Sequence, residues 1–366
     1  MFSPSVSPPI TSAEEITPER VAAFVGCHPD QIESVVVQPG PESLFALHHR
    51  VAITYRTGMG DLPRALLVKR NPPTTPAFAA NRGGLEVRFY TEVVPCLGRF
   101  KALPVPRCYN VGFRLASGNW HLVLEDLSQS HTPAETLLPH TDEQCREAIR
   151  TLAATHGALW DLPELECVAD FPEPRPPAEE LRRRFKRTLT NLGPFLEGLG
   201  DSLSPGQKAQ FERLANQLPE IWATRFAQRP EGHPGFTLVH GETHPWNFHF
   251  PREAGSQGTL LGNWQTYRAG TPATDLTCVM VLNWGPEQRG RMEAELVRLW
   301  HSHLLEAGVT EYDWEDCWMD YLRAAALMFY APVRYWMSGV PQTVWHPWLE
   351  NLLAAHDDLN LEQLLA

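Results

Sequence analysis

The chain has 366 residues, which is too long for one small core and fits one large or two medium globular units. Hydrophobic residues make up 43% and charged residues 20%, a composition that excludes a globally disordered chain. Lys and Arg number 31 against 43 Asp and Glu, so the formal net charge is -12. Because that charge repels a phosphate backbone, we expect no nucleic-acid partner and favour a small cationic ligand.

The seven cysteines are scattered and include no C-x-x-C pair, so they predict neither a zinc knuckle nor a redox motif. They are typical of the reduced thiols of a cytoplasmic protein. The first residues carry neither a basic nor an apolar signal region, and no run approaches the roughly 18 apolar residues of a membrane helix. We therefore expect a soluble cytoplasmic protein that does not bind a membrane.

The first part of the chain predicts a small antiparallel sheet. Residues 1–16 are rich in Pro and Ser and predict a flexible tail, after which Thr17 and Pro18 predict a capped helix start. Runs of β-branched residues, separated by Pro and Gly turns, then predict strands, with one helix before the last two strands. The strands are expected at residues 34–37, 50–55, 65–69, 107–113 and 120–124, and the helix at 84–94.

Beyond residue 126 the hydrophobic period is mostly that of helices. The expected helices are residues 143–160, 177–199, 205–226, 289–307 and 314–337. The prediction is an α+β protein, in which a sheet-rich lobe at residues 17–126 precedes a large helical lobe at residues 127–366.

The most informative segment is the sequence H-G-E-T-H-P-W-N at residues 240–247, with Asn263 sixteen residues after Asn247. In phosphoryl transfer, a loop carboxylate orients the acceptor hydroxyl, a nearby Asn holds Mg²⁺, and a further carboxylate bridges the metal ions to the phosphates. A zinc site built from His240, Glu242 and His244 is the alternative. Alternate residues on a loop do not reproduce the helical H-E-x-x-H spacing, however, and no third ligand is apparent.

These motifs resemble those of the aminoglycoside phosphotransferase and choline kinase family. Its pattern is H-G-D-x-H-x-x-N, then I-D-W or I-D-F, then G-x-P-x-x-D-L; this chain has L-G-N-W at residues 261–264 and G-T-P-A-T-D-L at residues 270–276. The resemblance extends over roughly residues 30 to 350. It implies a protein-kinase-like two-lobed fold, with a small antiparallel-sheet N-lobe and a large helical C-lobe.

The resemblance also implies roles for individual residues. Lys69 matches the lysine that pairs with phosphates, and Glu86 matches its partner on a helix; an ordinary surface ion pair is the alternative. Glu125 and Leu127 fall in the hinge segment, whose backbone would bind adenine. Asp275 would brace the catalytic loop through backbone hydrogen bonds.

Two departures from the family pattern affect catalysis. Glu242 stands in place of the catalytic aspartate, so Glu242 and His244 are the candidate acid-base residues, with the carboxylate one methylene further out. Asn247 and Asn263 are the candidate metal ligands. Asn263 replaces an aspartate and is neutral, which weakens the site. Glu42 adds repulsion near the expected triphosphate, so we expect ATP and Mg²⁺ to bind weakly or not at all.

A substrate region is predicted on the helix that starts near residue 314. Trp314, Trp318 and Tyr321 share one helix face, and Asp316 and Asp320 lie on the same helix. Aromatic faces and carboxylates both attract cations, so Trp314, Asp316, Trp318 and Asp320 are the candidate substrate residues for a cationic small molecule. Core packing of the rings is the alternative.

Three functions are consistent with the sequence. The first is a phosphotransferase-like enzyme acting on a small, amine-containing metabolite, with impaired or lost ATP-dependent phosphoryl transfer. The second is a kinase-fold enzyme repurposed for acid-base chemistry without a nucleotide. The third is a non-catalytic pseudokinase that binds a ligand, because a fold alone does not fix a function.

Overall fold

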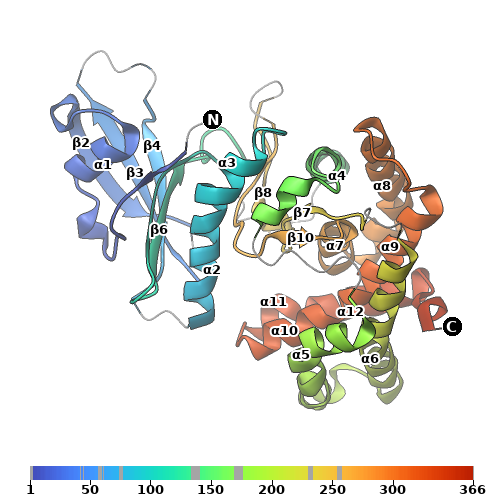
Figure 1. Cartoon of the computed structure of the whole chain (residues 1–366). Coiled ribbons are helices and arrows are strands. Elements are labelled where there is room, and N and C mark those ends of the chain that lie inside the picture. Colours follow the sequence, from blue (N-terminus) through green and yellow to red (C-terminus); the bar gives the residue numbers. More distant parts are fainter. Residues whose placement is uncertain are drawn as a thin grey trace. The chain divides into compact units, whose positions relative to one another are not determined.

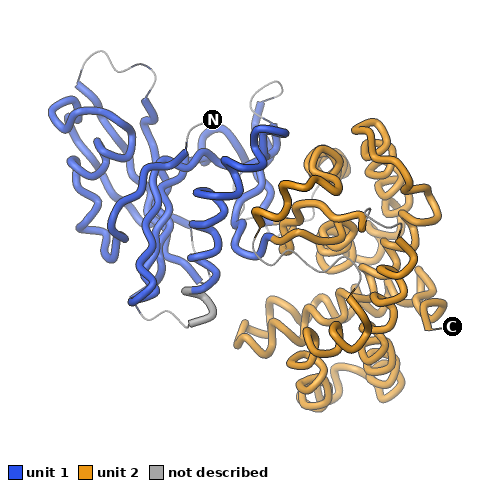
Figure 2. The backbone as a smooth tube through the Cα atoms, viewed as in Figure 1, with its two compact units in different colours: residues 1–137, 246–267 blue, residues 138–245, 268–366 orange. Residues whose placement is uncertain are grey.

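The computed structural model of the chain describes residues 3–41, 43, 45–56, 60, 62–73, 77–132, 141–168, 176–229, 234–253 and 258–365. It divides into two compact units (Figure 2). The first contains residues 1–137 and 246–267, and the second contains residues 138–245 and 268–366. The N-lobe was predicted to end at residue 126, and the sequence did not indicate that residues 246–267 fold with it.

The first unit is built on a six-stranded sheet of order β1-β5-β6-β4-β3-β2, whose neighbours are antiparallel except for the parallel pair β1 and β5. Helix α1 (Pro18–Val25) is capped by Thr17, whose side-chain oxygen accepts a hydrogen bond from the Arg20 backbone N–H. Buried apolar side chains of α1, β2, β3, β4 and β6, most of them β-branched, form its core. The strands are Ser5–Val6 (β1), Ile32–Pro39 (β2), Leu47–Tyr55 (β3), Ala65–Arg70 (β4), Cys108–Arg114 (β5) and Asn119–Glu125 (β6).

The N-terminal segment is not a free tail, contrary to the expectation from its composition. Strand β1 pairs with β5, and Ile10 is fully buried. The buried His121 accepts a hydrogen bond from the Ile10 backbone N–H at 3.1 Å and bonds Asn110 Oδ1 at 2.7 Å. A free sheet edge and a buried imidazole supply the partners that a Pro/Ser-rich composition does not reveal.

Helix α2 (Ala77–Arg88) lies beside β6 and continues through a π-helical turn (Phe89–Val93) into α3 (Val94–Leu97) (Figure 1). A Cβ atom at Gly83 would lie 2.0 Å from Trp120 Cε2, so only glycine permits this approach to the sheet. The short hairpin of β8 (Phe248–His249) and β9 (Leu260–Leu261) completes the first unit.

The second unit is mostly helical, around a two-stranded ladder of β7 (Thr237–Val239) and β10 (Arg268–Gly270). The helix predicted over residues 314–337 is broken near Phe329, because Pro332 lies in the first turn of a new helix, where it needs no backbone N–H partner. The helices are Asp142–Ala158 (α4), Ala178–Gly198 (α5), Pro205–Gln228 (α6), Ala273–Thr277 (α7), Pro286–Glu306 (α8), Trp314–Leu327 (α9), Tyr330–Met337 (α10), Gln342–Trp345 (α11) and Pro347–Asp358 (α12).

The prediction of an α+β protein is confirmed, with the sheet in the first unit and most helices in the second. Within the described part of the chain, no helix combines the length and the apolar character needed to cross a membrane.

Candidate functional site

Four residues of the first unit form one hydrogen-bonded group, here called the Lys69 cluster: Lys69, Glu86, Asn247 and Asn263. Lys69 Nζ donates to Glu86 Oε2 at 2.6 Å and to Asn263 Oδ1 at 2.7 Å. Asn263 Nδ2 donates in turn to Asn247 Oδ1 at 2.6 Å. The structure therefore brings together the predicted phosphate-binding pair and the two predicted metal ligands.

Local structure explains how residues so distant in sequence meet. Strand β4 carries Lys69, and the close approach of α2 to the sheet carries Glu86 to it. The β8–β9 hairpin places Gly262 beside Asn247, whose backbone oxygen accepts from the Gly262 N–H at 2.9 Å. Asn263 then takes a left-handed backbone with φ of 62°, which asparagine tolerates better than most residues.

Burial distinguishes this cluster from a surface ion pair. Lys69 is 3% exposed and Glu86 is fully buried. A charged group that is removed from water in this way requires an opposite charge beside it. The Lys69 ammonium and the Glu86 carboxylate fulfil this requirement for each other. The Lys69 charge also reaches His48 on the next strand, where burial and Lys69 together lower the pKa of His48 to about 4. The alternative of an ordinary surface pair is therefore wrong.

The charge on Lys69 fixes the direction of both amide groups in the cluster. A lysine ammonium can only donate, so the Asn263 atom facing Lys69 is the carbonyl oxygen and its NH₂ group faces Asn247. Asn247 must then turn its own oxygen inward to accept. Both amide oxygens, which are the atoms a hard cation prefers, accept a hydrogen bond within the protein. Glu86 Oε2 is bonded to Lys69, while the buried Glu86 Oε1 has no hydrogen-bond partner among the described residues.

The predicted hinge residues, Glu125 and Leu127, lie at and just after the end of β6, and some of their backbone groups form hydrogen bonds within the chain. The Glu125 N–H donates to the Arg107 carbonyl at 2.9 Å, and the Leu127 carbonyl accepts from the His131 N–H at 2.9 Å. Burial raises the pKa of the Glu125 carboxyl group. These two backbone groups are therefore engaged within the chain.

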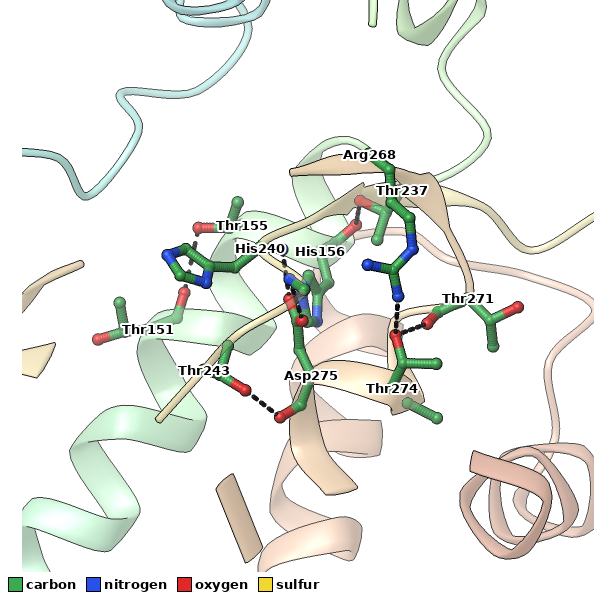
Figure 3. A network of polar contacts seen from close by, with 12 residues as sticks. Thr151, Thr155, His156, Thr237, His240, Thr243, Arg268, Thr271, Thr274 and Asp275 are labelled. Atoms are coloured by element: carbon green, nitrogen blue, oxygen red, sulfur yellow. Dashed lines mark hydrogen bonds and ion pairs between the residues drawn. The ribbon is translucent and has the colours of Figure 1, made fainter. Parts of the chain in front are cut away.

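In the second unit, Asp275 organises the start of the loop that carries Glu242. Its carboxylate accepts from the backbone N–H groups of His240 at 2.7 Å and Gly241 at 2.8 Å (Figure 3). Its backbone oxygen accepts from the Thr243 hydroxyl at 2.5 Å. Burial alone would raise the pKa of Asp275, but the hydrogen bond from His156 and the bonds from the loop hold it below the usual range. The predicted bracing role of Asp275 is confirmed.

Glu242 follows directly on this braced turn. Gly241 has a φ of 85°, a conformation that a residue with a Cβ atom rarely adopts, and the Glu242 N–H donates to His240 Nδ1 at 3.2 Å. The Glu242 side chain is half-buried. Burial lowers the pKa of Arg268, and the charges of Asp275 and Glu242 act in the opposite direction. The second unit therefore presents an ionisable carboxylate near a cation, on a fixed backbone.

His244 is held on several sides within the second unit. Its ring stacks on Trp348 with centroids 5.3 Å apart, and Nε2 lies 2.8 Å from the Tyr335 hydroxyl. Nδ1 lies 3.2 Å from Asn283 Nδ2. With 3% of its surface exposed, His244 is placed as a packed positioning residue rather than as an acid-base group open to a ligand.

Asp320, which was predicted to bind a cationic substrate, already has a buried cation. Arg225 of α6 donates to both of its carboxylate oxygens, at 3.1 and 3.0 Å, and both side chains are almost fully buried. Asp320 also accepts from the Tyr312 hydroxyl at 3.4 Å. The residue therefore holds α9 to α6, and the structure does not support a substrate role for it.

Two of the other predicted substrate residues, Trp314 and Asp316, also contact the protein's own arginines. Asp316 pairs with Arg229 at 3.1 Å, and the guanidinium of Arg298 lies 4.1 Å from the Trp314 ring centroid. Trp318 stacks between Trp314 and Tyr321. This continuous stripe of stacked rings favours the packing alternative over a pocket for a cation.

Several partners were not identified from the sequence. His156 on α4 bonds Asp275 at 3.4 Å, and its backbone oxygen accepts from Thr237. A lone histidine on an amphipathic helix carries no signal that marks it as a partner of a loop more than eighty residues away. Glu42 lies outside the described residues. Among those that the structure describes, no group of three or more His, Cys, Asp or Glu could hold a metal ion.

The fold is that of the kinase-like phosphotransferases. An ethanolamine kinase from Plasmodium vivax is similar over 92% of this chain and 85% of that chain, with 12% identity and a TM-score of 0.54. The GDP complex of an aminoglycoside 2'-phosphotransferase is similar over 94% and 97%, with 13% identity and a TM-score of 0.52. A choline/ethanolamine kinase family protein from Mesorhizobium loti is similar over 90% and 91%, with 11% identity and a TM-score of 0.50.

The chain belongs to the ecdysteroid kinase-like family, whose sequence model matches residues 43–309. No curated protein sequence matches it. The resemblance drawn from the motifs at residues 240–247, 261–264 and 270–276 is confirmed, as is the protein-kinase-like fold.

Proposed function

We propose that this protein is a phosphotransferase-like protein for a small, amine-containing metabolite, in which ATP- and Mg²⁺-dependent phosphoryl transfer is impaired or lost. The observation that carries the proposal is the hydrogen-bond chain from Lys69 through Asn263 to Asn247. It engages in internal hydrogen bonds the two amide oxygens that would ligate a metal ion. Because the two amides are neutral, the cluster also lacks the charge that binds Mg²⁺ against a triphosphate.

Because Asn263 lies between Lys69 and Asn247 in this hydrogen-bond chain, the substitution Asn263→Asp is expected to favour metal binding in two ways. The new carboxylate accepts from Lys69 and adds a negative charge. Its second oxygen cannot donate to Asn247, so Asn247 must reverse its amide and release its oxygen from the internal bond. A single substitution therefore restores both the charge and the oxygen ligands.

Calorimetric titration of ATP with and without Mg²⁺ tests the proposal. For the wild-type protein, we expect that Mg²⁺ does not increase the affinity for ATP. For Asn263→Asp, we expect an increase of at least about tenfold on adding Mg²⁺, equivalent to about 1.4 kcal/mol. Asn81→Asp, which adds the same charge at an exposed position of α2, is the matched control and is expected to resemble the wild type. A micromolar, Mg²⁺-dependent affinity in the wild type contradicts the proposal.

The substrate class rests on two supports. The names of the similar structures refer to ethanolamine, choline and aminoglycosides, which are amine-containing molecules. The formal net charge of -12 also favours a cation over an anion. The acids and rings of α9 add no support. Arginines of the chain pair with Asp316 and Asp320, and the rings of Trp314, Trp318 and Tyr321 stack on one another. A thermal-shift panel of amines and matched neutral analogues tests this class: larger shifts with the neutral compounds oppose it.

Acid-base chemistry without a nucleotide is the second candidate, and Glu242 favours it. This carboxylate is retained on a rigid, braced loop, whereas the Lys69 cluster has no carboxylate at residue 263. We expect Glu242→Gln to abolish turnover of any metabolite in the panel that the wild type converts, as followed by mass spectrometry. Glu287→Gln, at an exposed position of α8, is the charge-matched control. Equal rates in Glu242→Gln and the wild type would contradict acid-base catalysis by Glu242, whereas no conversion of any compound by the wild type would favour the non-catalytic pseudokinase.

A further inference from the structure

We infer that Arg268 and Arg334 of the second unit bind a carboxylate group of a small-molecule ligand beside the loop that carries Glu242. Arg268 lies on β10 and Arg334 on α10. The functions proposed above assign no role to either arginine. The inference concerns binding alone, so it does not depend on the proposed function.

Arg268 differs from the buried arginines of the second unit in having no acidic partner. Four described arginines of this unit are buried, and each has a carboxylate oxygen within 3.7 Å: Arg225 with Asp320, Arg229 with Asp316, Arg289 with Glu293 and Arg323 with Asp320. Arg268 is half-buried, and no carboxylate in the described part of the chain forms an ion pair with it. A charge that is removed from water without a countercharge is costly, so this guanidinium calls for an anion from outside the chain.

Most of the hydrogen-bonding capacity of Arg268 is open to a ligand. Its side chain extends from β10 toward Thr274, whose hydroxyl accepts a weak bond from Nη2 at 3.4 Å (Figure 3). Nε and Nη1 form no hydrogen bond with any residue that the structure describes, and both atoms remain accessible to solvent. A guanidinium presents its N–H groups as a planar fork that matches the two oxygens of a carboxylate. Arg268 is therefore able to donate to a carboxylate without giving up an existing ion pair.

Arg334 adds a second positive charge to the same region. It is exposed on α10, and none of the described carboxylates pairs with it. The next residue, Tyr335, reaches the loop through His244 Nε2 at 2.8 Å, and Arg268 pairs with Val239, directly before the loop. Burial lowers the pKa of Arg268 and the charge of Arg334 lowers it further, so the two cations lie close enough to repel each other. An anion that both of them bind removes this repulsion.

The acids of this region favour a ligand group with a single negative charge. The carboxylates of Asp275 and Glu242 act against burial and raise the pKa of Arg268, so both lie near its guanidinium without pairing with it. Asp275 is bonded to the loop backbone, and Glu242 is half-buried beside it. Both acids repel an approaching anion, and they repel the dianion of a phosphate group more strongly than a monoanion. The surroundings of the two arginines therefore match a carboxylate.

Calorimetric titration with propionate, and with propionamide as its neutral isostere, tests the inference at constant ionic strength. The wild type is expected to bind propionate at least about tenfold more tightly than propionamide, and Arg268→Gln is expected to remove this preference. Arg334→Gln, at an exposed position, is expected to weaken propionate binding about threefold. Arg187→Gln, which removes the same charge at an exposed position of α5, is the matched control and is expected to resemble the wild type.

Three outcomes overturn the inference: equal affinities of the wild type for the two compounds, no saturation by propionate up to about 100 mM, or an undiminished preference in Arg268→Gln. Unchanged propionate affinity in Arg334→Gln overturns the part assigned to that residue. Inorganic phosphate identifies the anion, because tighter binding of phosphate than of propionate contradicts a carboxylate site. Propionate carries no amine, so its failure to bind is distinguishable from failure of the proposed amine-containing metabolite.

NMR spectra of the arginine side chains give a second readout that does not need Arg268→Gln to fold. The Nε–H signal of Arg268 is the one that disappears in Arg268→Lys, which keeps the charge but lacks the planar fork. In the wild type, this signal is expected to shift on adding propionate and to stay in place on adding propionamide. An unchanged Arg268 signal at the highest propionate concentration contradicts binding at this residue.

Discussion

At the scale of single residues, the same charged side chain has different uses depending on which charges the fold brings to it. Asp320 and Asp316 are one helical turn apart on α9, and in sequence both look like ligands for a cation. Asp320 is buried against Arg225, while Asp316 keeps about half of its side chain exposed and pairs with the buried Arg229. We therefore expect Asp320 to contribute more than Asp316 to the free energy of unfolding, because its carboxylate is the more deeply buried.

We predict that Asp320→Asn destabilises the protein by about 3–5 kcal/mol, because it leaves the buried Arg225 without its countercharge. Glu315→Gln, the control at an exposed position of the same helix, is expected to cost less than about 1 kcal/mol. Urea unfolding of the two variants measures both values. Equal losses of stability would contradict the structural role assigned to Asp320.

At the scale of elements, the position of α2 determines whether Lys69 and Glu86 can pair. Gly83 allows the helix to lie against Trp120, and Glu86 then reaches Lys69 less than one turn later. The same element continues through the π-helical turn to Phe89 and its contact with Trp264. A change in the seating of α2 is therefore expected to disturb the whole Lys69 cluster.

Gly83→Ala is expected to destabilise the protein by about 1–3 kcal/mol, because its Cβ atom would overlap the Trp120 indole and force the helix away. The control is Gly290→Ala on α8, where a Cβ atom meets nothing within 4 Å. There we expect a gain of up to about 1 kcal/mol from the better helix propensity of alanine. Urea unfolding compares them; a neutral Gly83→Ala would show that this close approach is not required.

At the scale of the whole molecule, the N-terminal segment is joined to the first unit by His121. Burial lowers the pKa of His121 to about 3, while its neutral ring bonds both Ile10 and Asn110. The unfolded chain can bind this proton near pH 6.5, and the folded chain cannot. The resulting contribution to stability is complete above pH 6.5 and is lost progressively as the pH falls toward 3.

Between pH 7 and pH 5, the wild type is therefore expected to lose about 2 kcal/mol more of its free energy of unfolding than His121→Gln does. The substitution removes the titrating group, and the difference between the two proteins cancels groups that act in the opposite sense, such as Glu125, whose pKa is raised. Urea unfolding at the two pH values gives the comparison. The same pH dependence in both proteins would show that His121 does not exclude the proton.

The sequence by itself determined the order of strands and helices, because hydrophobic period and turn residues are local properties. It also determined the kinase-like fold and the pairing of Lys69 with Glu86, because the motifs that mark them stand in a fixed order along the chain. The bracing role of Asp275 was likewise predicted from its motif and is confirmed by its two bonds to the loop backbone.

Only the tertiary structure decided which charges are satisfied inside the protein. The sequence shows Asp320 and a distant Arg225, but their pairing depends on how α6 and α9 pack. The inward direction of the Asn247 oxygen depends on a lysine from another strand, which fixes the amide of Asn263 between them. Hydrogen bonds and ion pairs act over a few ångströms in space, so residues far apart in sequence decide them, and no local pattern records the outcome.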